Sequence, residues 1–158
     1  MTVFEPPRPL TKTDSLADFH SGVDLVDAWA REHASRAQKT GTAVVYIVKS
    51  GEKIAGFYSL SAHSVQRDDV AGGWLKRNAP EQIPAILLGM LGVDVSFQGL
   101  GLGKSLLKDA VERSLAASAQ IGARALLVDP VNRGVAEFYK RYGFRELAET
   151  TRLALPLA

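Results

Sequence analysis

The stretch ILLGMLGVDVSFQGLGLGKSLLKDAVERSL, residues 86–115, predicts a buried strand, a glycine-rich turn and an amphipathic helix. Residues 86–95 are too few and too interrupted by glycine to span a membrane, and too apolar for a surface strand. We therefore expect a central strand that is covered on both faces. Beyond Lys104, apolar residues return at helical spacing, with charged residues between them; they are Leu106, Leu107, Ala110, Val111 and Leu115.

The glycines of the turn indicate a site for phosphate. Gly99, Gly101 and Gly103 have no Cβ, so the main chain can approach a ligand closely and adopt positive φ. The first turn of the following helix has N–H groups without intrahelical partners, and its dipole end is positive. With Lys104 beside them, these groups form a cradle for phosphate.

Two well-known glycine loops do not fit this spacing. A dinucleotide fingerprint needs G-x-G-x-x-G, whereas Gly99, Gly101 and Gly103 are evenly spaced. A Walker A loop ends in Gly-Lys-Ser or Gly-Lys-Thr, as Gly103-Lys104-Ser105 does, but its first glycine would fall at Gln98. Both classes of nucleotide-binding loop are therefore excluded.

The pattern Q/R-x-x-G-x-G/A does fit, through Gln98, Gly101 and Gly103, and it resembles the acetyl-CoA pyrophosphate loop of the GNAT acetyltransferases. A second motif follows in the expected order, N-x5-F-Y-x3-G-F, which begins at Asn132 and ends at Phe144. An ordinary tight turn would explain the loop alone, but not the two motifs together. The resemblance covers both strand–loop–helix segments.

This resemblance implies a fold and a co-substrate. The fold would be α/β (α+β), a GNAT fold with a central mixed, mostly antiparallel sheet of six to seven strands. The sheet would splay at the acetyl-CoA site and carry about four helices, within a single domain over residues 1–158. Acetyl-CoA would be the co-substrate, and no metal is implied.

The same resemblance implies the roles of individual residues. Pantetheine would pair with the central strand at Leu91, Gly92 and Val93, where Gly92 allows a bulge. Tyr139 would protonate the coenzyme A thiolate, for which a phenol is a suitable acid; the alternative is a core tyrosine beside Phe138. The remaining expected coenzyme contacts are Gln98, Gly99, Leu100, Gly101, Leu102, Gly103, Lys104, Asn132 and Phe138.

The sequence offers no obvious general base. Asp94 lies next to the loop, but a strand-end hydrogen-bond acceptor is an equal interpretation. An α-amino group has a pKa of about 7.7–8.0, so part of it is neutral near pH 7, whereas a lysine at about 10.4 needs more help. The absence of a base therefore favours a substrate with an α-amine.

Composition excludes several other classes of site. The 158 residues are 46% hydrophobic and 23% charged, which is typical of a globular protein. Without cysteine there is no disulfide, thiolate nucleophile or zinc–cysteine site. His20, His33 and His63 lie far apart without metal-ligand spacing. No signal peptide or membrane-spanning run occurs, so we expect a cytoplasmic enzyme.

Charge gives a weak indication of nucleic acid. Nineteen basic and seventeen acidic residues leave a net charge of +2, which does not by itself argue for RNA. If the fold gathered certain basic residues around one cleft, they would form a surface that tracks phosphates; an ordinary solvated surface is the alternative. These candidates are Arg31, Arg36, Lys39, Lys76, Arg77, Lys140 and Arg141.

Local patterns predict the remaining elements. They are an edge strand near residues 6–10, a helix from about Leu25 to Gln38, and a hairpin over residues 43–62 that turns at Gly51. Residues 66–84 predict a long loop in which Trp74 either anchors the loop to the core or lines a channel. Also expected are a helix stop at Gly122, a strand over residues 123–128, an N-cap at Asn132 and a last strand within residues 146–157.

A narrower resemblance covers nearly the whole chain. Residues 4–10, 19–29, 75–84 and 88–94 are similar to the acetyltransferase toxins of bacterial toxin–antitoxin modules, of the TacT and AtaT type. It implies acetylation of the α-amine of aminoacyl-tRNA, a block of translation, and a ribbon-helix-helix (DUF1778-type) antitoxin as partner; a homodimer is also expected. Two departures are Met90, where many relatives carry Arg, and His20-Ser21 in place of Asp-Cys.

Two other functions stay open at this point. A housekeeping acetyltransferase would act on a small amine or a protein N-terminus and would leave growth unaffected. A module that only binds acetyl-CoA would transfer nothing to any acceptor. Tyr139 favours an enzyme over a binding module, and the narrower resemblance favours the toxin.

Overall fold

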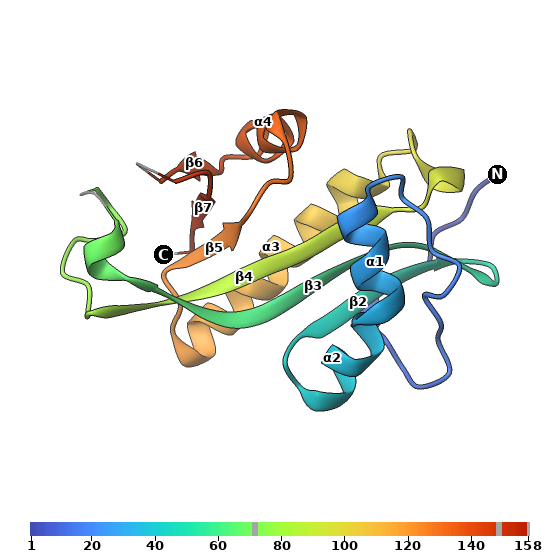
Figure 1. The fold of residues 1–158 in the computed structure, drawn as a ribbon, viewed down its shortest axis with the longest axis horizontal. Coiled ribbons are helices and arrows are strands. Elements are labelled where there is room, and N and C mark those ends of the chain that lie inside the picture. The colour runs from blue at the N-terminus through green and yellow to red at the C-terminus, as the bar shows by residue number, and fades with distance from the viewer. Residues whose placement is uncertain (71–72, 148–149, 158) are drawn as a thin grey trace. The chain divides into compact units, whose positions relative to one another are not determined.

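The structure is a computed structural model, and it describes residues 1–70, 73–147 and 150–157 (Figure 1). Contacts along the chain divide it into two compact units. The first unit comprises Met1–Ser61 and Gly89–Ala110, and the second comprises Ala62–Leu88 and Val111–Ala158. Each unit has a hydrophobic core of its own.

The strands form a mixed sheet in the order β1-β2-β3-β4-β5-β7-β6. β4 and β5 are parallel, whereas the pairs β1–β2, β2–β3, β5–β7 and β6–β7 are antiparallel. Seven strands and four α-helices in the described part of the chain confirm the predicted fold class. The strands are β1 Arg8–Pro9, β2 Val44–Ser50, β3 Lys53–Gln66, β4 Gln82–Val93, β5 Ala125–Val128, β6 Arg145–Glu146 and β7 Leu153–Pro156.

The first unit is built on the predicted hairpin. β2 and β3 turn at Gly51, whose φ of 61° lies in the left-handed region that glycine tolerates. Arg8 of β1 pairs with Ile47, so the proline-rich entry is an edge strand as predicted. β3 runs on to Gln66, beyond the predicted end at residue 62.

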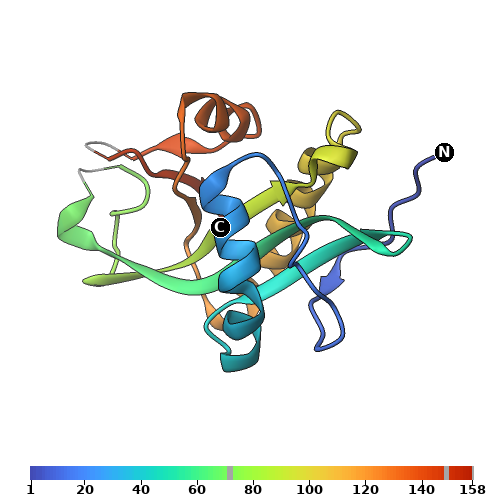
Figure 2. The ribbon, with the colours of Figure 1, turned by 45° about the vertical axis from the view of Figure 1, so that its right-hand side comes forward.

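The two faces of β3 are covered by different helices. Figures 1 and 2 show α1, Asp24–Glu32, and α2, Ala34–Thr40, in front of the hairpin, and the first turns of α3, Leu102–Ile121, behind it. On the α1 face, the Phe57 ring packs edge-on to Phe19 with centroids 5.0 Å apart. On the other face, Gly56 lies against α3, where a Cβ would stand 2.9 Å from Leu106 Cδ1. The alternation of these neighbours is that of a strand buried on both sides.

The helix predicted from Leu25 to Gln38 is in fact two helices. His33 departs from helical geometry, with φ −124° and ψ −24°, so α1 ends and α2 begins at this residue. The bend lets Ala34 of α2 be buried like Ala30 of α1. Apolar spacing continues across the break, and this is why periodicity alone did not reveal it.

The second unit contains the parallel pair of strands. Ala85–Leu88 of β4 pair with Ala125–Val128 of β5, and there β5 ends. β4 begins at Gln82, so the predicted loop over residues 66–84 is shorter than expected and Pro84 lies within a strand. Residues 71 and 72 of that loop lie outside the described residues.

Trp74 anchors this loop, as one of the two interpretations predicted. It packs against a core cluster that includes Leu75 and Leu127, and the Arg145 guanidinium lies 5.6 Å from its ring centroid. The short strand β6, Arg145–Glu146, was not predicted because two residues carry no periodic pattern. The last strand, β7, confirms the prediction for the tail.

Candidate coenzyme and acid–base site

The glycine loop has the geometry of an anion cradle. Gly99 and Gly101 have φ of 80° and 81°, and a Cβ at either would meet nothing within 4 Å. The main chain is therefore open to a ligand at both glycines. The turn leads into α3, where Ser105 N donates to Gly101 O at 3.2 Å. The amides of residues 102–104 precede this bond and are the free donors of a helix start.

The strand that leads into the loop passes close to the N-terminal segment. Gly92 is buried, and a Cβ there would lie 2.7 Å from Val26 Cγ1 and 3.3 Å from the Phe19 ring. Close packing therefore explains why this position has no side chain, and the bulge that the sequence suggested here stays a prediction. Leu91 and Val93 flank it at the end of β4, half-buried.

Gln98 holds the loop through contacts within the protein. Its Nε2 donates to Ser21 O at 2.8 Å and to Val93 O at 2.9 Å. Because a side-chain amide has two hydrogens on this nitrogen, both are engaged. The main-chain amides and the exposed Lys104, rather than the Gln98 side chain, are therefore the candidate phosphate contacts of this loop.

Asp94 is a strand-end acceptor. Its carboxylate accepts from His20 N at 3.1 Å and from Ser96 N at 3.0 Å, while its own N–H donates to Ala55 O at 2.8 Å. These bonds close the short turn between β4 and the loop. Of the two interpretations of Asp94, the structural one agrees with these contacts.

Tyr139 lies in the second unit, on α4, Arg133–Arg141. Its side chain is 6% exposed, between the rings of Phe138 and Phe144, whose centroids are 5.2 and 5.3 Å away. Burial raises the pKa of the Tyr139 hydroxyl above its ordinary value. Among the described residues no hydrogen bond to this hydroxyl is found. At neutral pH it is thus a protonated phenol with its proton available to a ligand.

The raised pKa predicts a signature of Tyr139 in alkaline solution. In the unfolded chain its phenol ionises near pH 10, whereas the folded protein resists the charge, so folding stability falls as pH rises above about 10. Below that pH the group contributes no pH dependence. Thermal unfolding between about pH 8 and 11 should show a steeper alkaline fall in Tm for the wild type than for Tyr139→Phe. Equal slopes would contradict the buried, neutral phenol.

Asn132 begins α4 as predicted. With φ −160° it is extended, and its Oδ1 accepts from Val135 N at 2.9 Å, as an N-cap does. Phe138 is half-buried and edge-on to Tyr139 and Tyr142. The coenzyme contacts expected of Asn132 and Phe138 stay predictions.

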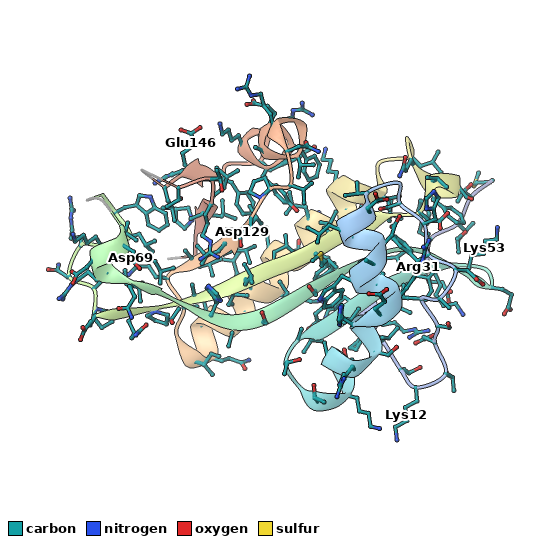
Figure 3. The ribbon with its side chains drawn as sticks, in the orientation of Figure 1. Lys12, Arg31, Lys53, Asp69, Asp129 and Glu146 are labelled. Atoms are coloured by element: carbon teal, nitrogen blue, oxygen red, sulfur yellow. The ribbon has the colours of Figure 1, made fainter. Side chains whose placement is uncertain are left out.

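The basic candidates fall into two groups. Arg31, Arg36 and Lys39 belong to the first unit, and Lys76, Arg77, Lys140 and Arg141 to the second. Two of them already have protein partners: Arg31 donates to Phe19 O, and Lys140 pairs with Glu137 and Glu146 (Glu146 is labelled in Figure 3). Arg36, Lys39, Arg77 and Arg141 are exposed.

Sequence reasoning missed a buried carboxylate network. Asp27 is 4% exposed and accepts from Ser21 N and Ser21 Oγ, both at 2.7 Å, and from Gly22 N at 3.2 Å. His20 Nδ1 lies 3.1 Å from the same carboxylate. The His20-Ser21 pair thus binds a helix carboxylate, and no periodic pattern signals such a contact. Met90, the other departure, packs on the core of the first unit.

The described residues contain no group of three or more histidines, cysteines or carboxylates that could hold a metal ion. Nor does any helix in the described part of the chain have the length and apolarity needed to cross a membrane. His63 instead lies 3.2 Å from Arg152, which is paired with Asp129 (labelled in Figure 3).

Comparison with known proteins identifies the family. The acetyltransferase (GNAT) domain matches residues 41–146 of this chain, a range that includes the glycine loop and the whole of α4. This chain belongs to the GNAT acetyltransferases. The GNAT resemblance is thereby confirmed, and the roles of the loop and of Tyr139 stay predictions.

Two similar proteins are named as toxins. One is the tRNA-acetylating toxin of Mycobacterium tuberculosis, 35% identical over 157 residues, which cover 99% of this chain and 93% of the relative. The other is the probable toxin TacT of Sinorhizobium fredii, 30% identical over 167 residues, with coverage of 99% and 91%. The narrower resemblance is thus confirmed over nearly the full chain.

Two similar solved structures contain bound molecules. AtaT in complex with acetyl-methionyl-tRNAfMet superimposes with a TM-score of 0.85 at 26% identity, covering 98% of this chain and 95% of AtaT. A tyrosine-to-phenylalanine variant of AtaT, bound to the C-terminus of the antitoxin AtaR and to acetyl-CoA, superimposes with a TM-score of 0.83 at 25% identity, with coverage of 98% and 94%.

Proposed function

We propose that this chain transfers the acetyl group of acetyl-CoA to the α-amino group of aminoacyl-tRNA and so blocks translation. The observation that carries this proposal is its similarity over nearly its whole length to a tRNA-acetylating toxin. The loop with two open, left-handed glycines before α3 supports a coenzyme diphosphate, and the protonated Tyr139 supports an acid.

The reaction divides between these groups. The diphosphate binds the amides at the start of α3, and the pantetheine arm pairs with β4 near Leu91–Val93. A neutral α-amine attacks the thioester carbonyl and the carbon–sulfur bond breaks, while Tyr139 gives its proton to the sulfur. The nitrogen of the new amide loses one proton to water, and the Tyr139 phenolate regains one from water, which restores the neutral phenol. No buried base is needed because a fraction of an α-amine is already neutral near pH 7.

The proposed partners follow from the relatives. A toxin of this kind needs a cognate antitoxin, which we propose to be of the ribbon-helix-helix type, and a homodimer is our expectation for the active form. The exposed basic residues Arg36, Lys39, Arg77 and Arg141 are our candidates for tRNA phosphates. Because charged tRNA is found in the cytoplasm, we propose that the enzyme acts there.

One experiment tests the proposal directly. The purified protein is incubated with labelled acetyl-CoA and a mixture of charged tRNAs, and the labelled aminoacyl ends are identified after hydrolysis. We expect label on the α-amine of one or a few aminoacyl-tRNAs. Label confined to proteins or free amines would support a housekeeping acetyltransferase instead, and tight coenzyme binding without any transfer would support a binding module.

A further inference from the structure

The segment Phe19–Gly22 runs alongside the end of β4 and the glycine loop of the first unit. Its first three residues contact successive points of that path. The Phe19 ring packs on Gly92. His20 N donates to the Asp94 carboxylate and His20 O accepts from Val95 N, while Ser21 O accepts from Gln98 Nε2. The segment thus follows the strand, the turn and the loop in order.

The same segment is held on its other side by α1. Arg31, labelled in Figure 3, donates from Nε at 2.9 Å and from Nη2 at 2.6 Å to the single oxygen Phe19 O. Asp27, one turn earlier on α1, accepts from Ser21 and Gly22. Arg31 and Asp27 of α1 therefore both hydrogen-bond to the segment that lies beside the loop.

We propose that Arg31 and Gln98 are positioning residues for acetyl-CoA, acting through the segment Phe19–Gly22. Arg31 holds the segment against α1, and Gln98 ties the segment and the end of β4 to the glycine loop. Together they keep the loop amides where the diphosphate binds. This inference rests on the coenzyme site of the proposed function, and it changes the role of Arg31 from a tRNA contact to a determinant of coenzyme affinity.

The chemistry of these bonds selects the substitutions. Gln98→Glu keeps the shape but sets a carboxylate against two carbonyl oxygens, so it should be worse than Gln98→Ala. Gln98→Arg keeps at least two hydrogen-bond donors and should retain the bonds to the carbonyl oxygens of Ser21 and Val93. Arg31→Lys has a single nitrogen in place of the two guanidinium nitrogens that donate to Phe19 O, so it should recover little of the acetyl-CoA affinity.

The test measures acetyl-CoA affinity apart from tRNA. Calorimetry gives the Kd for acetyl-CoA, and steady-state kinetics on charged tRNA give kcat and both KM values. For Arg31→Ala and Gln98→Glu we expect Kd and KM for acetyl-CoA to rise about tenfold, since one or two hydrogen bonds are lost. The KM for charged tRNA and kcat should change less than about twofold.

Controls separate this inference from a general loss of folding. Gln98→Arg should recover most of the affinity, and Gln120→Ala, an exposed glutamine on α3, should leave it unchanged. Thermal unfolding is measured for each variant; if Arg31→Ala does not fold, Arg31→Lys takes its place. A raised KM for charged tRNA with unchanged acetyl-CoA affinity would overturn the inference and return Arg31 to the tRNA surface. Failure of the wild type to bind acetyl-CoA would instead overturn the proposed function.

Discussion

Replacing Tyr139 by phenylalanine is expected to lower kcat by about 10²–10⁴-fold, the range typical of a lost general acid. This substitution removes only the hydroxyl group, and the ring that packs between Phe138 and Phe144 stays in place. The leaving thiolate would then have to take its proton from water. The measurement is single-turnover acetyl transfer to charged tRNA with acetyl-CoA in excess.

The matched control is Tyr142→Phe on the same segment. Tyr142 is 37% exposed and also contacts Phe138, so its hydroxyl tests whether any phenol in this aromatic cluster suffices. Tyr139→Phe should keep its affinity for acetyl-CoA and its Tm near neutral pH, and Tyr142→Phe should keep kcat. A Tyr139→Phe enzyme with kcat within about threefold of the wild type would refute its role as the acid.

Among the proposed substitutions, Gly56→Ala should have the largest effect on stability. A Cβ at this position would lie 2.9 Å from Leu106 Cδ1, 3.1 Å from Leu102 Cδ2 and 3.2 Å from the main-chain oxygen of Gly92. The side chains of α3 can shift, but the oxygen of β4 cannot move alone. Overpacking of this kind lowers the free energy of unfolding by about 1–3 kcal/mol, which denaturant unfolding will measure.

Gly56→Ala should also weaken the coenzyme site. Leu102 is the first residue of α3, so pushing it outward displaces the amides that begin the helix. The control is Gly51→Asn in the same hairpin, because φ there is 61°, nothing lies within 4 Å, and Asn tolerates this region. Unfolding free energies for the two variants that agree within about 0.5 kcal/mol would contradict close packing at Gly56.

The elements that local chemistry specifies were predicted well. The hairpin at Gly51, the strand–loop–helix around Gln98 and the N-cap at Asn132 each depend on neighbouring residues and on backbone geometry that glycine or a capping side chain permits. The break at His33 and the strand over Pro84 were missed. Both depend on what the chain packs against, which no short window contains.

In the candidate site, too, some residues are recognisable from local motifs and others only from contacts between distant parts of the chain. The glycines of the loop and Tyr139 are recognisable because a motif lies within a few positions of each. The contacts of Arg31 with Phe19 and of Gln98 with Ser21 join residues 12 and 77 positions apart. Spacing of that length carries no periodic signal, so Arg31 was assigned to the tRNA surface on charge alone.

The order of residues was enough to identify the family and to predict the phosphate loop and the acid, because the motifs that indicate them are short and their geometry is local. Folding in three dimensions decided which basic side chains have protein partners and why Gly56 and Gly92 must lack a side chain. It also decided that Gln98 holds the loop by donating to carbonyl groups. The physical reason is that close packing and hydrogen bonding depend on pairs of residues that are far apart in the sequence. These residues come into contact only when the chain folds.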